Sequence, residues 1–295
     1  MMSSEKLFSY TQSQRDRLAF IDLRVRYLGE IRRNELASRF GIQVVAATRD
    51  ISVYKELAPH NLVYNSREKI YERGEPFEPV FDFPVERVLA WIYQGFGDVE
   101  PCRSKPIIQC EYPDISQNPN LDVLSTLTRA IQHKNVVEIS IQGVPRNKSK
   151  NEITPFALAN GGYGWVVRGY DRQSENFCDV PLVRISEAKL TSSEVLDNEL
   201  QANDIQWNRI VELELAPHPN NIRKSSSVEL DYGMKDGIIK VKVRAALVGY
   251  FLRRWGVDCS EKHSLKGAEY QLWLSNRQTL YGVENLSIAP GHDKK

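Results

Sequence analysis

The sequence has few cysteines and no pairing pattern among them. The four cysteines are scattered and form no CxxC pair: Cys102, Cys110, Cys178 and Cys259. Free thiols in a reducing compartment are therefore expected, in preference to disulfides or a metal site. The five histidines show no metal-ligand spacing such as HExxH. The sequence accordingly predicts no metal and no other cofactor.

Long apolar runs are also missing. No stretch approaches the ~18 apolar residues that a membrane span needs, and the N-terminal segment is polar. We therefore expect a cytoplasmic protein without a membrane partner. With 41% hydrophobic and 26% charged residues, the composition is ordinary for a globular protein, and 295 residues are enough for two or three domains.

Signatures of catalysis are absent as well. The chain contains no GxSxG elbow, no P-loop and no GxGxxG fingerprint. The GGYG run at 161–164 lies between two predicted strands and does not open a helix, which favours a hairpin turn over a phosphate loop. We expect a protein that is not an enzyme.

The segment from 34 to 72 is the most informative part of the chain, and an amphipathic helix over 14–28 precedes it. Asn34 is predicted to cap a short helix, and Gly41 is predicted to end it with a positive φ. A second helix follows over 44–58, and two short β-like runs then flank residues 65–67. This order predicts a winged helix-turn-helix, whose second helix enters the major groove of DNA.

The predicted second helix separates an apolar face from a polar one. The apolar face is expected to be buried and comprises Val44, Ala47, Ile51, Tyr54 and Ala58. The DNA contacts are expected from the helix and the wing: Gln43, Thr48, Arg49, Ser52, Lys55, Arg67 and Lys69. Two alternatives stay open, an ion pair between Arg49 and Glu56, and a wing with ordinary surface charges. Net charge does not decide between them, because it is only +1.

Beyond the wing, the pattern indicates a connector and two further domains. Residues 76–120 are rich in proline and include a predicted helix near 85–93. A helix from 121 leads into alternating strands near 137–142, 153–159, 165–171 and 177–185, which favour a small barrel over 121–195. Residues 205–295 combine alternating strands with a helix near 245–258, in which Phe251 and Trp255 are expected to be buried. This unit is predicted to be an α+β domain.

Two arginines stand within the apolar strands of the predicted barrel. Arg168 lies in the run WVVRGYD and Arg184 in PLVRI. Because an arginine is costly to bury alone, either both bind an anionic ligand or both form structural ion pairs. The candidate ion-pair partners are Glu138, Asp171 and Asp179. The candidate ligand site comprises Ser140, Arg146, Trp165, Arg168, Tyr170 and Arg184.

A further basic row occurs in the third unit. Lys240, Lys242 and Arg244 alternate along one face of a predicted strand. This row is either a second basic surface or a solvated strand face, and the second interpretation is favoured.

The middle segment resembles the WYL domain through Ile153-Thr154-Pro155, through GWVVRGY at 164–170 and through Val183-Arg184-Ile185. The name-giving Trp-Tyr-Leu triplet stands here as Trp165-Val166-Val167, a departure at two of three positions. The third unit is similar to the extension that accompanies this domain, with LAPHP at 215–219, ELDYGM at 229–234 and RAAL at 244–247. Together the units resemble the WYL transcription regulators found beside phage-defence systems of the BREX and CBASS types.

This resemblance implies a fold and a function. The expected fold class is an α+β multidomain protein with a winged helix-turn-helix at 1–75, an Sm-like or SH3-like barrel at 121–195 and a dimerisation domain at 205–295. The implied protein is a homodimeric repressor on a palindromic double-stranded operator, switched by a nucleotide or nucleic-acid effector at the barrel. The alternative is an RNA- or nucleotide-binding sensor that uses its helical unit for protein contact.

Overall fold

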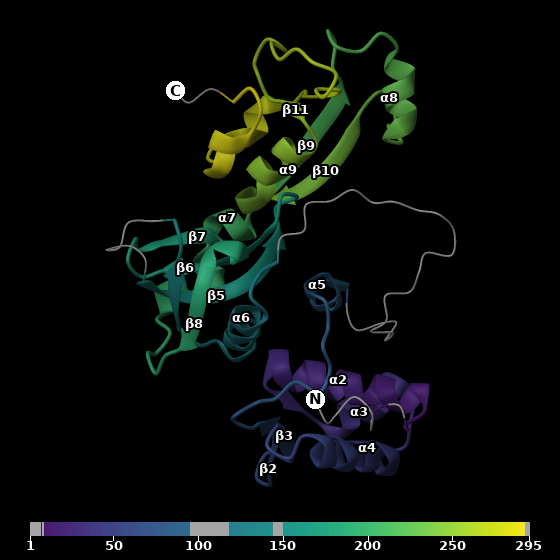
Figure 1. The fold of residues 1–295 in the computed structure, drawn as a ribbon. Coiled ribbons are helices and arrows are strands. Elements are labelled where there is room, and N and C mark those ends of the chain that lie inside the picture. Colours follow the sequence, from purple (N-terminus) through teal and green to yellow (C-terminus); the bar gives the residue numbers. More distant parts are fainter. Residues whose placement is uncertain (1–6, 8, 95–117, 144–149, 293–295) are drawn as a thin grey trace. The chain divides into compact units, whose positions relative to one another are not determined.

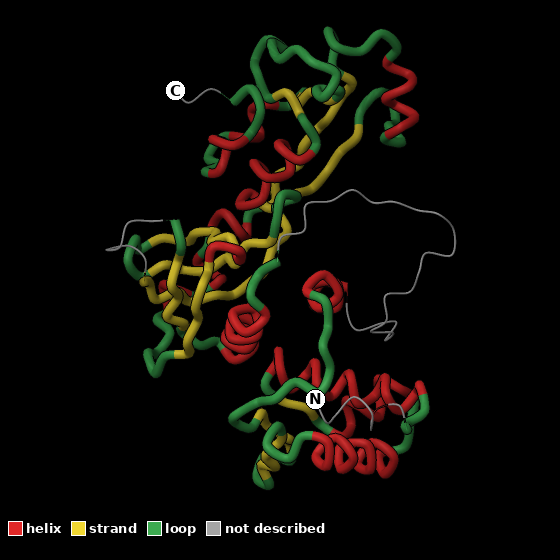
Figure 2. The backbone as a smooth tube through the Cα atoms, in the orientation of Figure 1, coloured by secondary structure: helices red, strands yellow, loops and turns green. Residues whose placement is uncertain are grey.

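The computed structural model describes residues 7, 9–94, 118–143 and 150–292 (Figures 1 and 2). The chain forms two compact units, Met1–Asn151 with Val183–Ser192 and Glu152–Leu182 with Ser193–Lys295. The strands lie in sheets of order β1-β3-β2, β7-β6-β5-β4-β8 and β10-β9-β12-β11. Among the described residues, no helix has both the length and the apolar character that a membrane crossing requires.

The first unit begins with the predicted winged helix. Its elements are α2 (Gln12–Leu28), β1 (Glu30–Ile31), α3 (Arg33–Phe40), α4 (Val44–Leu57), β2 (Leu62–Asn65) and β3 (Ile70–Arg73). The three short strands pair antiparallel, and the β2–β3 hairpin follows α4 in the chain (Figure 1). The domain core is apolar and includes Leu18, Ile21, Val25, Leu36 and Ile51. The winged helix-turn-helix prediction is confirmed.

Helix α3 (Arg33–Phe40) begins two residues earlier than predicted. Arg32 is its N-cap, and the prediction of Asn34 was wrong. The carboxylate of Glu35 explains the shift, because its Oε2 accepts a hydrogen bond from the Arg32 amide at 2.8 Å and so satisfies the helix start. At the other end, Gly41 has φ 62°, as its predicted role in the turn requires.

Two helices follow the wing in the first unit. The predicted linking helix is present as α5 (Val85–Gln94). The next helix, α6 (Leu121–His133), is capped by Asn120, whose side chain accepts from the amides of Asp122 and Val123. Strands β4 (Val137–Ile141) and β8 (Ile185–Leu190) pair antiparallel. Helix α6 packs against both α2 and β8, so it connects the winged helix to this strand pair within one unit.

The contacts between α6 and α2 are polar as well as apolar. Ser125 Oγ donates to the carbonyl oxygen of Arg26 at 2.7 Å, and the Arg26 guanidinium lies 3.3 Å from Asp122 Oδ1. Nε2 of His133 lies 2.7 Å from the Leu28 carbonyl oxygen, which can only accept, so the proton sits on Nε2. Gly29 has φ 86° beside this histidine. A Cβ at Gly29 would lie 3.0 Å from His133 Nε2.

The middle segment forms three antiparallel strands: β5 (Lys150–Asn160), β6 (Trp165–Asp171) and β7 (Asn176–Pro181). The predicted last strand does not continue to 185, because β7 ends at Pro181, which lacks an amide hydrogen for the ladder. A 3-10 turn, η2 (Leu182–Arg184), comes between β7 and β8. The pairings of the described strands show no closure of the sheet, so the barrel stays a prediction.

The C-terminal segment mixes strands, helices and 3-10 turns, as predicted. The strands are β9 (Ile210–Pro217), β10 (Ile239–Arg244), β11 (Val257–Asp258) and β12 (Leu272–Leu274). The helices are α7 (Ile205–Asn208), α8 (Ser225–Asp231) and α9 (Val248–Arg254). The 3-10 turns are η3 (Asp197–Glu199), η4 (Gln201–Asn203), η5 (Ala245–Leu247), η6 (Arg277–Leu280) and η7 (Asn285–Ile288).

Helix α9 packs on one face of this last sheet. Val248 and Leu252 share a buried apolar cluster with Leu213, Leu215 and Leu274 of the strands. Phe251 is only partly buried against this cluster. The prediction that Trp255 is buried was wrong: it follows the end of α9 and is 44% exposed.

Candidate functional site

Helix α4 presents a polar face to solvent. Gln43, Arg49, Ser52 and Lys55 are exposed, and Thr48 is half-buried. Gln43 is the N-cap residue, but its side chain makes no capping hydrogen bond and so stays available to a ligand. Within the described part of the chain, no side-chain partner of Arg49 or Lys55 is found, and this includes the alternative partner Glu56. The two cations are thus placed where a duplex could reach them.

The opposite face of α4 is fixed by buried polar contacts. Asp50 receives hydrogen bonds from Arg17 Nε at 2.6 Å and Gln14 Nε2 at 3.1 Å, both on α2. One turn later, the Tyr54 hydroxyl donates to Asp22 Oδ1 at 2.6 Å. Tyr54 is fully buried, in agreement with the predicted inward face. These contacts fix the rotation of α4 about its axis and therefore which side chains point outward.

Asp22 lies at the centre of this anchor. Its Oδ1 also accepts from the Val80 amide at 3.0 Å, and Asn61 Nδ2 donates to the Tyr54 hydroxyl at 2.9 Å. Burial raises the pKa of Asp22 to about 6, although the hydrogen bonds from Tyr54 and Val80 act in the opposite direction. The anchor therefore contains a carboxyl group that titrates near neutral pH.

Each of the two hydroxyls on the polar face of α4 makes one hydrogen bond within the helix. Thr48 Oγ1 donates to the Val44 carbonyl oxygen at 2.9 Å, and Ser52 Oγ donates to the Thr48 carbonyl oxygen at 3.0 Å. A hydroxyl has one donor and two acceptor positions, so each oxygen can still accept. In a major groove the matching donors are the amino groups of adenine and cytosine.

The wing has an ordered tip. Asn65 Oδ1 accepts from the amides of Arg67 and Glu68, each at 3.1 Å, and Lys69 closes the turn with φ 58°. The side chains of Arg67 and Lys69 are exposed. At the base of the wing, Arg33 Nη2 on α3 donates to the Tyr64 hydroxyl at 3.2 Å. The wing thus holds both predicted phosphate contacts on a defined hairpin.

Arg168 on β6 is engaged by two carboxylates. Its Nε and Nη2 donate to Asp204 at 2.6 and 3.1 Å, and its Nη1 donates to Asp179 Oδ1 at 3.0 Å. The residue is only 4% exposed. Of the two interpretations of Arg168, the structural ion pair with Asp179 is present, and Asp204 completes it. Direct contact between Arg168 and a ligand stays a prediction.

Burial and charge act against each other in this cluster. Burial alone lowers the pKa of Arg168, but the hydrogen bonds and charges of Asp204 and Asp179 outweigh it and raise the pKa. Burial likewise raises the pKa of Asp179 above its ordinary value, although Arg168 opposes it, and Tyr250 of α9 shares a hydrogen bond with Asp179. The Arg168 guanidinium thus binds the carboxylates of Asp179 and Asp204, and it holds together the two segments from which they come.

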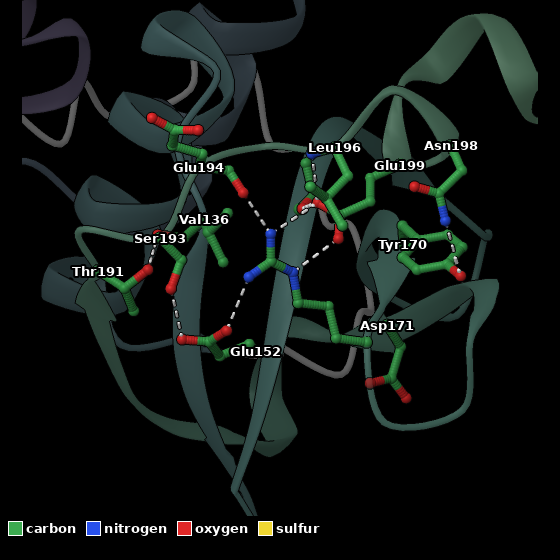
Figure 3. A network of polar contacts seen from close by, with 12 residues as sticks. Val136, Glu152, Tyr170, Asp171, Thr191, Ser193, Glu194, Leu196, Asn198 and Glu199 are labelled. Carbon is green, nitrogen blue, oxygen red and sulfur yellow. Dashed lines mark hydrogen bonds and ion pairs between the residues drawn. The ribbon is translucent and has the colours of Figure 1, made fainter.

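A second arginine, Arg172, makes a similar network that the sequence analysis did not predict. Its Nε donates to Glu199 Oε1 at 2.7 Å and its Nη1 to Glu152 Oε2 at 2.9 Å. Thr154 Oγ1 donates to Glu199 Oε2 at 2.7 Å. Figure 3 shows Glu152 and Glu199 directed toward the same guanidinium. Arg168 and Arg172 together tie the segment 197–204 to β5 and β6.

The other predicted ligand residues are differently placed. Arg184 is exposed in the 3-10 turn η2, so the expectation of an arginine inside an apolar strand was wrong for this position. The Tyr170 hydroxyl accepts from Asn198 Nδ2 at 3.4 Å, and Trp165 is half-buried. The Ser140 carbonyl oxygen accepts from Ser186 Oγ at 3.2 Å. Arg146 lies outside the described residues.

Two members of the basic row on β10, Lys240 and Lys242, are exposed, as the favoured interpretation of a solvated strand face requires, whereas Arg244 is half-buried. Lys240 Nζ lies 2.8 Å from Glu214 and 3.6 Å from Glu212 on the neighbouring strand β9. Lys242 is exposed, with Glu212 at 4.0 Å. The third member, Arg244, donates to the Trp207 carbonyl oxygen at 2.6 Å. Each of these cations therefore has a partner on its own domain.

Among the described residues, no group of three or more His, Cys, Asp or Glu side chains could hold a metal ion. Cys178 and Cys259 are free thiols. Both lie in the second unit, and burial raises the pKa of each to about 12, which keeps the thiols protonated at neutral pH.

Comparison with known proteins identifies both ends of the chain. Residues 13–94 match the BrxR transcriptional regulator winged helix-turn-helix domain, and residues 210–280 match the BrxR transcriptional regulator C-terminal dimerization domain. A solved structure, the proteasome accessory factor B/C of Arthrobacter aurescens, is 16% identical and covers 80% of this chain and 44% of that chain. Its TM-score of 0.25 is too low to support an argument about the fold.

Curated relatives match along nearly the whole length. The DNA-binding transcriptional repressor CapW of Escherichia coli strain KTE188 is 31% identical over 280 residues, covering 92% of this chain and 91% of the relative. CapW of Pseudomonas aeruginosa is 30% identical, covering 90% of each chain. These relatives are repressors and not enzymes, in agreement with the expectation from the sequence. The chain therefore belongs to the BrxR/CapW-type family of winged helix transcriptional regulators with a C-terminal dimerization domain.

Proposed function

We propose that this protein represses transcription of a phage-defence operon in the cytoplasm by binding a specific DNA duplex as a homodimer. The observation that carries the proposal is the exposed polar face of α4, held outward by the buried anchor at Asp22, Asp50 and Tyr54. A helix with donors and acceptors on a fixed face can read base edges in the major groove. The names of the CapW relatives support the same activity.

The dimer follows from the match of residues 210–280 to a dimerization domain. Two winged helices related by a twofold axis would read a palindromic operator. Its half-sites would be centred roughly 34–36 Å apart, one helical turn, or a multiple of this distance. Arg67 and Lys69 on each wing would contact the sugar-phosphate backbone beside the groove.

The test removes two cations from the reading face. In R49A/K55A, the affinity for a duplex taken from upstream of the protein's own gene should fall by at least tenfold. The slope of log K against log salt should decrease by about one for each phosphate that the variant no longer neutralises. Fluorescence anisotropy at several salt concentrations measures both quantities.

The matched control is K235A/K262A, which removes two exposed cations from the C-terminal segment. It should leave affinity and salt slope unchanged. Equal effects of the two double variants would contradict reading by α4. Binding of single-stranded RNA that survives R49A/K55A and is abolished in R184A would instead support a sensor of RNA.

We further propose that an anionic effector, a nucleotide or nucleic acid, switches the repressor by competing for Arg168. Its guanidinium already binds Asp204 in the two-point manner that it would use for a phosphate. An incoming phosphate would take the place of Asp204. Arg184, the other arginine of the predicted ligand site, is exposed in η2.

Asp204 connects this exchange to the dimerization domain. Its Oδ1 caps α7 by accepting from the Trp207 amide at 3.0 Å, and α7 leads directly into β9. Removal of the Asp204 contact would therefore loosen the segment before the domain that pairs the two protomers. A coupling of about 1–3 kcal/mol, usual for allostery, would change operator affinity roughly 5–150-fold.

The variant Asp204→Asn tests the competition, because it keeps the shape of the side chain and removes the competing charge. Pyrophosphate, used as a simple polyphosphate probe, should bind D204N several-fold more tightly than the unchanged protein in a calorimetric titration. Equal affinities would contradict an effector site at Arg168. Asp197→Asn, an exposed acid of the same segment, is the control.

A further inference from the structure

The polar face of α4 contains one apolar side chain that the DNA-reading argument has not used. Val45 is 81% exposed, the most exposed of the large hydrophobic residues of the helix. Val44 beside it is 45% exposed, which contradicts its predicted place on the buried face. The first turn of α4 extends past the domain core, so neither side chain is needed to fill it.

The position of Val45 on the helix is specific. Val45, Thr48, Arg49 and Ser52 follow the spacing i, i+3, i+4 and i+7, so they form one stripe. This stripe lies opposite the buried residues Ala47, Asp50, Ile51 and Tyr54. Val45 thus lies at the N-terminal end of the stripe that bears the donors and acceptors, whereas Val44 lies at its edge.

The N-terminal end of a recognition helix is the part that contacts base edges. Side chains of a helix also tilt toward its N-terminus, so the Val45 methyl groups lie at the end of α4 that would contact base edges. The base edges in a major groove carry one apolar group, the C5-methyl of thymine. A valine in this place has no hydrogen bond to offer and matches that methyl group by van der Waals contact.

We infer that Val45 contacts the C5-methyl group of a thymine in each operator half-site and thereby specifies thymine at that position. The inference rests on the proposed duplex reading by α4 and adds to it the chemical group that is read. Thr48 and Ser52 accept from adenine or cytosine amino groups, Arg49 donates to guanine or phosphate, and Val45 supplies the apolar contact.

The experiment uses deoxyuridine, which pairs as thymine does and lacks only the methyl group. The full-length protein first selects its site from a random-sequence duplex library. Each thymine of the selected duplex is then replaced by deoxyuridine, and affinity is measured for the unchanged protein, for V45S and for V63S. Val63 is an exposed valine on the wing strand β2. It serves as the matched control, because the thymine methyl group is displayed only in the major groove.

One thymine in each half-site should stand out. Replacing it should weaken binding of the unchanged protein and of V63S roughly three- to fivefold, the value of one buried methyl-sized group. The same replacement should have no effect on V45S, because this variant already lacks the valine methyl groups that would contact the thymine methyl group. Thermal melting should be the same for all three proteins, since both valines are on the surface.

Other outcomes overturn the inference. Equal deoxyuridine effects in the unchanged protein and V45S, or no sensitive thymine at all, would show that Val45 does not read the methyl group, while duplex binding itself would stand. Failure of the unchanged protein to select any duplex would overturn both this inference and the proposed function.

Discussion

Asp22 is the residue whose charge state bears most directly on the recognition helix. It lies on α2 and is fully buried, and its carboxylate accepts from the Tyr54 hydroxyl of α4 and from the Val80 amide. Its pKa of about 6 lies above the ordinary value of 3.8, because burial disfavours the charged form. At neutral pH the ionised form of Asp22 is therefore favoured less strongly in the folded domain than in the unfolded chain.

This shift predicts a pH dependence of stability. Because the folded-state pKa is raised, the folded protein holds the proton more tightly, and the stabilisation is complete below about pH 4 and disappears as pH rises through about 6. The difference in free energy of unfolding between the unchanged protein and Asp22→Asn should therefore change by on the order of 2 kcal/mol between pH 4 and 7. Urea unfolding at a series of pH values measures it.

The control for this prediction is Asp82→Asn, which removes an exposed carboxyl group near the same domain. A difference for Asp22→Asn that stays flat from pH 4 to 7, or that follows the difference measured for Asp82→Asn, would contradict a titrating carboxyl group in the α4 anchor.

Single residues also mark where sequence patterns stop being informative. Of the two partners of Arg168, Asp179 was among the predicted candidates, but Asp204 was not, because it is 36 residues away and no pattern links the two. Arg184 was misplaced because Pro181 ends β7 and the following turn exposes the side chain. Val44 and Trp255 fit an apolar helical stripe, but each lies at a helix end beyond the core.

At the scale of elements, periodicity was a better guide. Helices α2, α4, α5 and α6 and strands β4, β5 and β6 were all predicted, because each has a buried face with its own spacing. The exposed positions of Gln43, Arg49, Ser52 and Lys55 followed from the same spacing. Contacts between elements could not be predicted from this spacing, because the ion pairs Arg17–Asp50 and Arg172–Glu199 depend on tertiary packing.

Helix α6 is an element whose attachment to the winged helix can be measured. Ser125→Ala removes one of two donors to the Arg26 carbonyl oxygen of α2; the other is Arg73 Nη1 at 3.3 Å. Loss of this hydrogen bond should lower the free energy of unfolding by about 0.5–1.5 kcal/mol. Hydrogen exchange at the C-terminal end of α2 should increase in the same variant, because α6 holds that end.

Thr126→Ala provides the comparison within the same helix. Its hydroxyl donates to the Asp122 carbonyl oxygen inside α6 and does not reach α2. Stability should change less than in Ser125→Ala, and exchange in α2 should stay as it was. Identical exchange in both variants would contradict a role for Ser125 in holding the two helices together.

At the scale of the whole molecule, two winged helices on one dimer require a fixed phase between half-sites. Inserting about 5 base pairs between the half-sites turns one of them to the opposite side of the duplex, so binding should fall by at least tenfold. Inserting about 10 base pairs restores the phase and should recover part of the affinity. Gel shifts with the full-length protein measure both, and equal binding to both insertions would contradict paired reading.

The way in which α6 holds α2 has a consequence for exchanging domains between regulators. Two of its three polar contacts, from Ser125 and His133, are made to backbone carbonyl oxygens of α2. Every α2 sequence displays these oxygens, so the joint depends little on the side chains of the partner helix. A winged helix with a different operator preference could therefore be grafted onto this α6, provided that the left-handed glycine at Gly29 is kept.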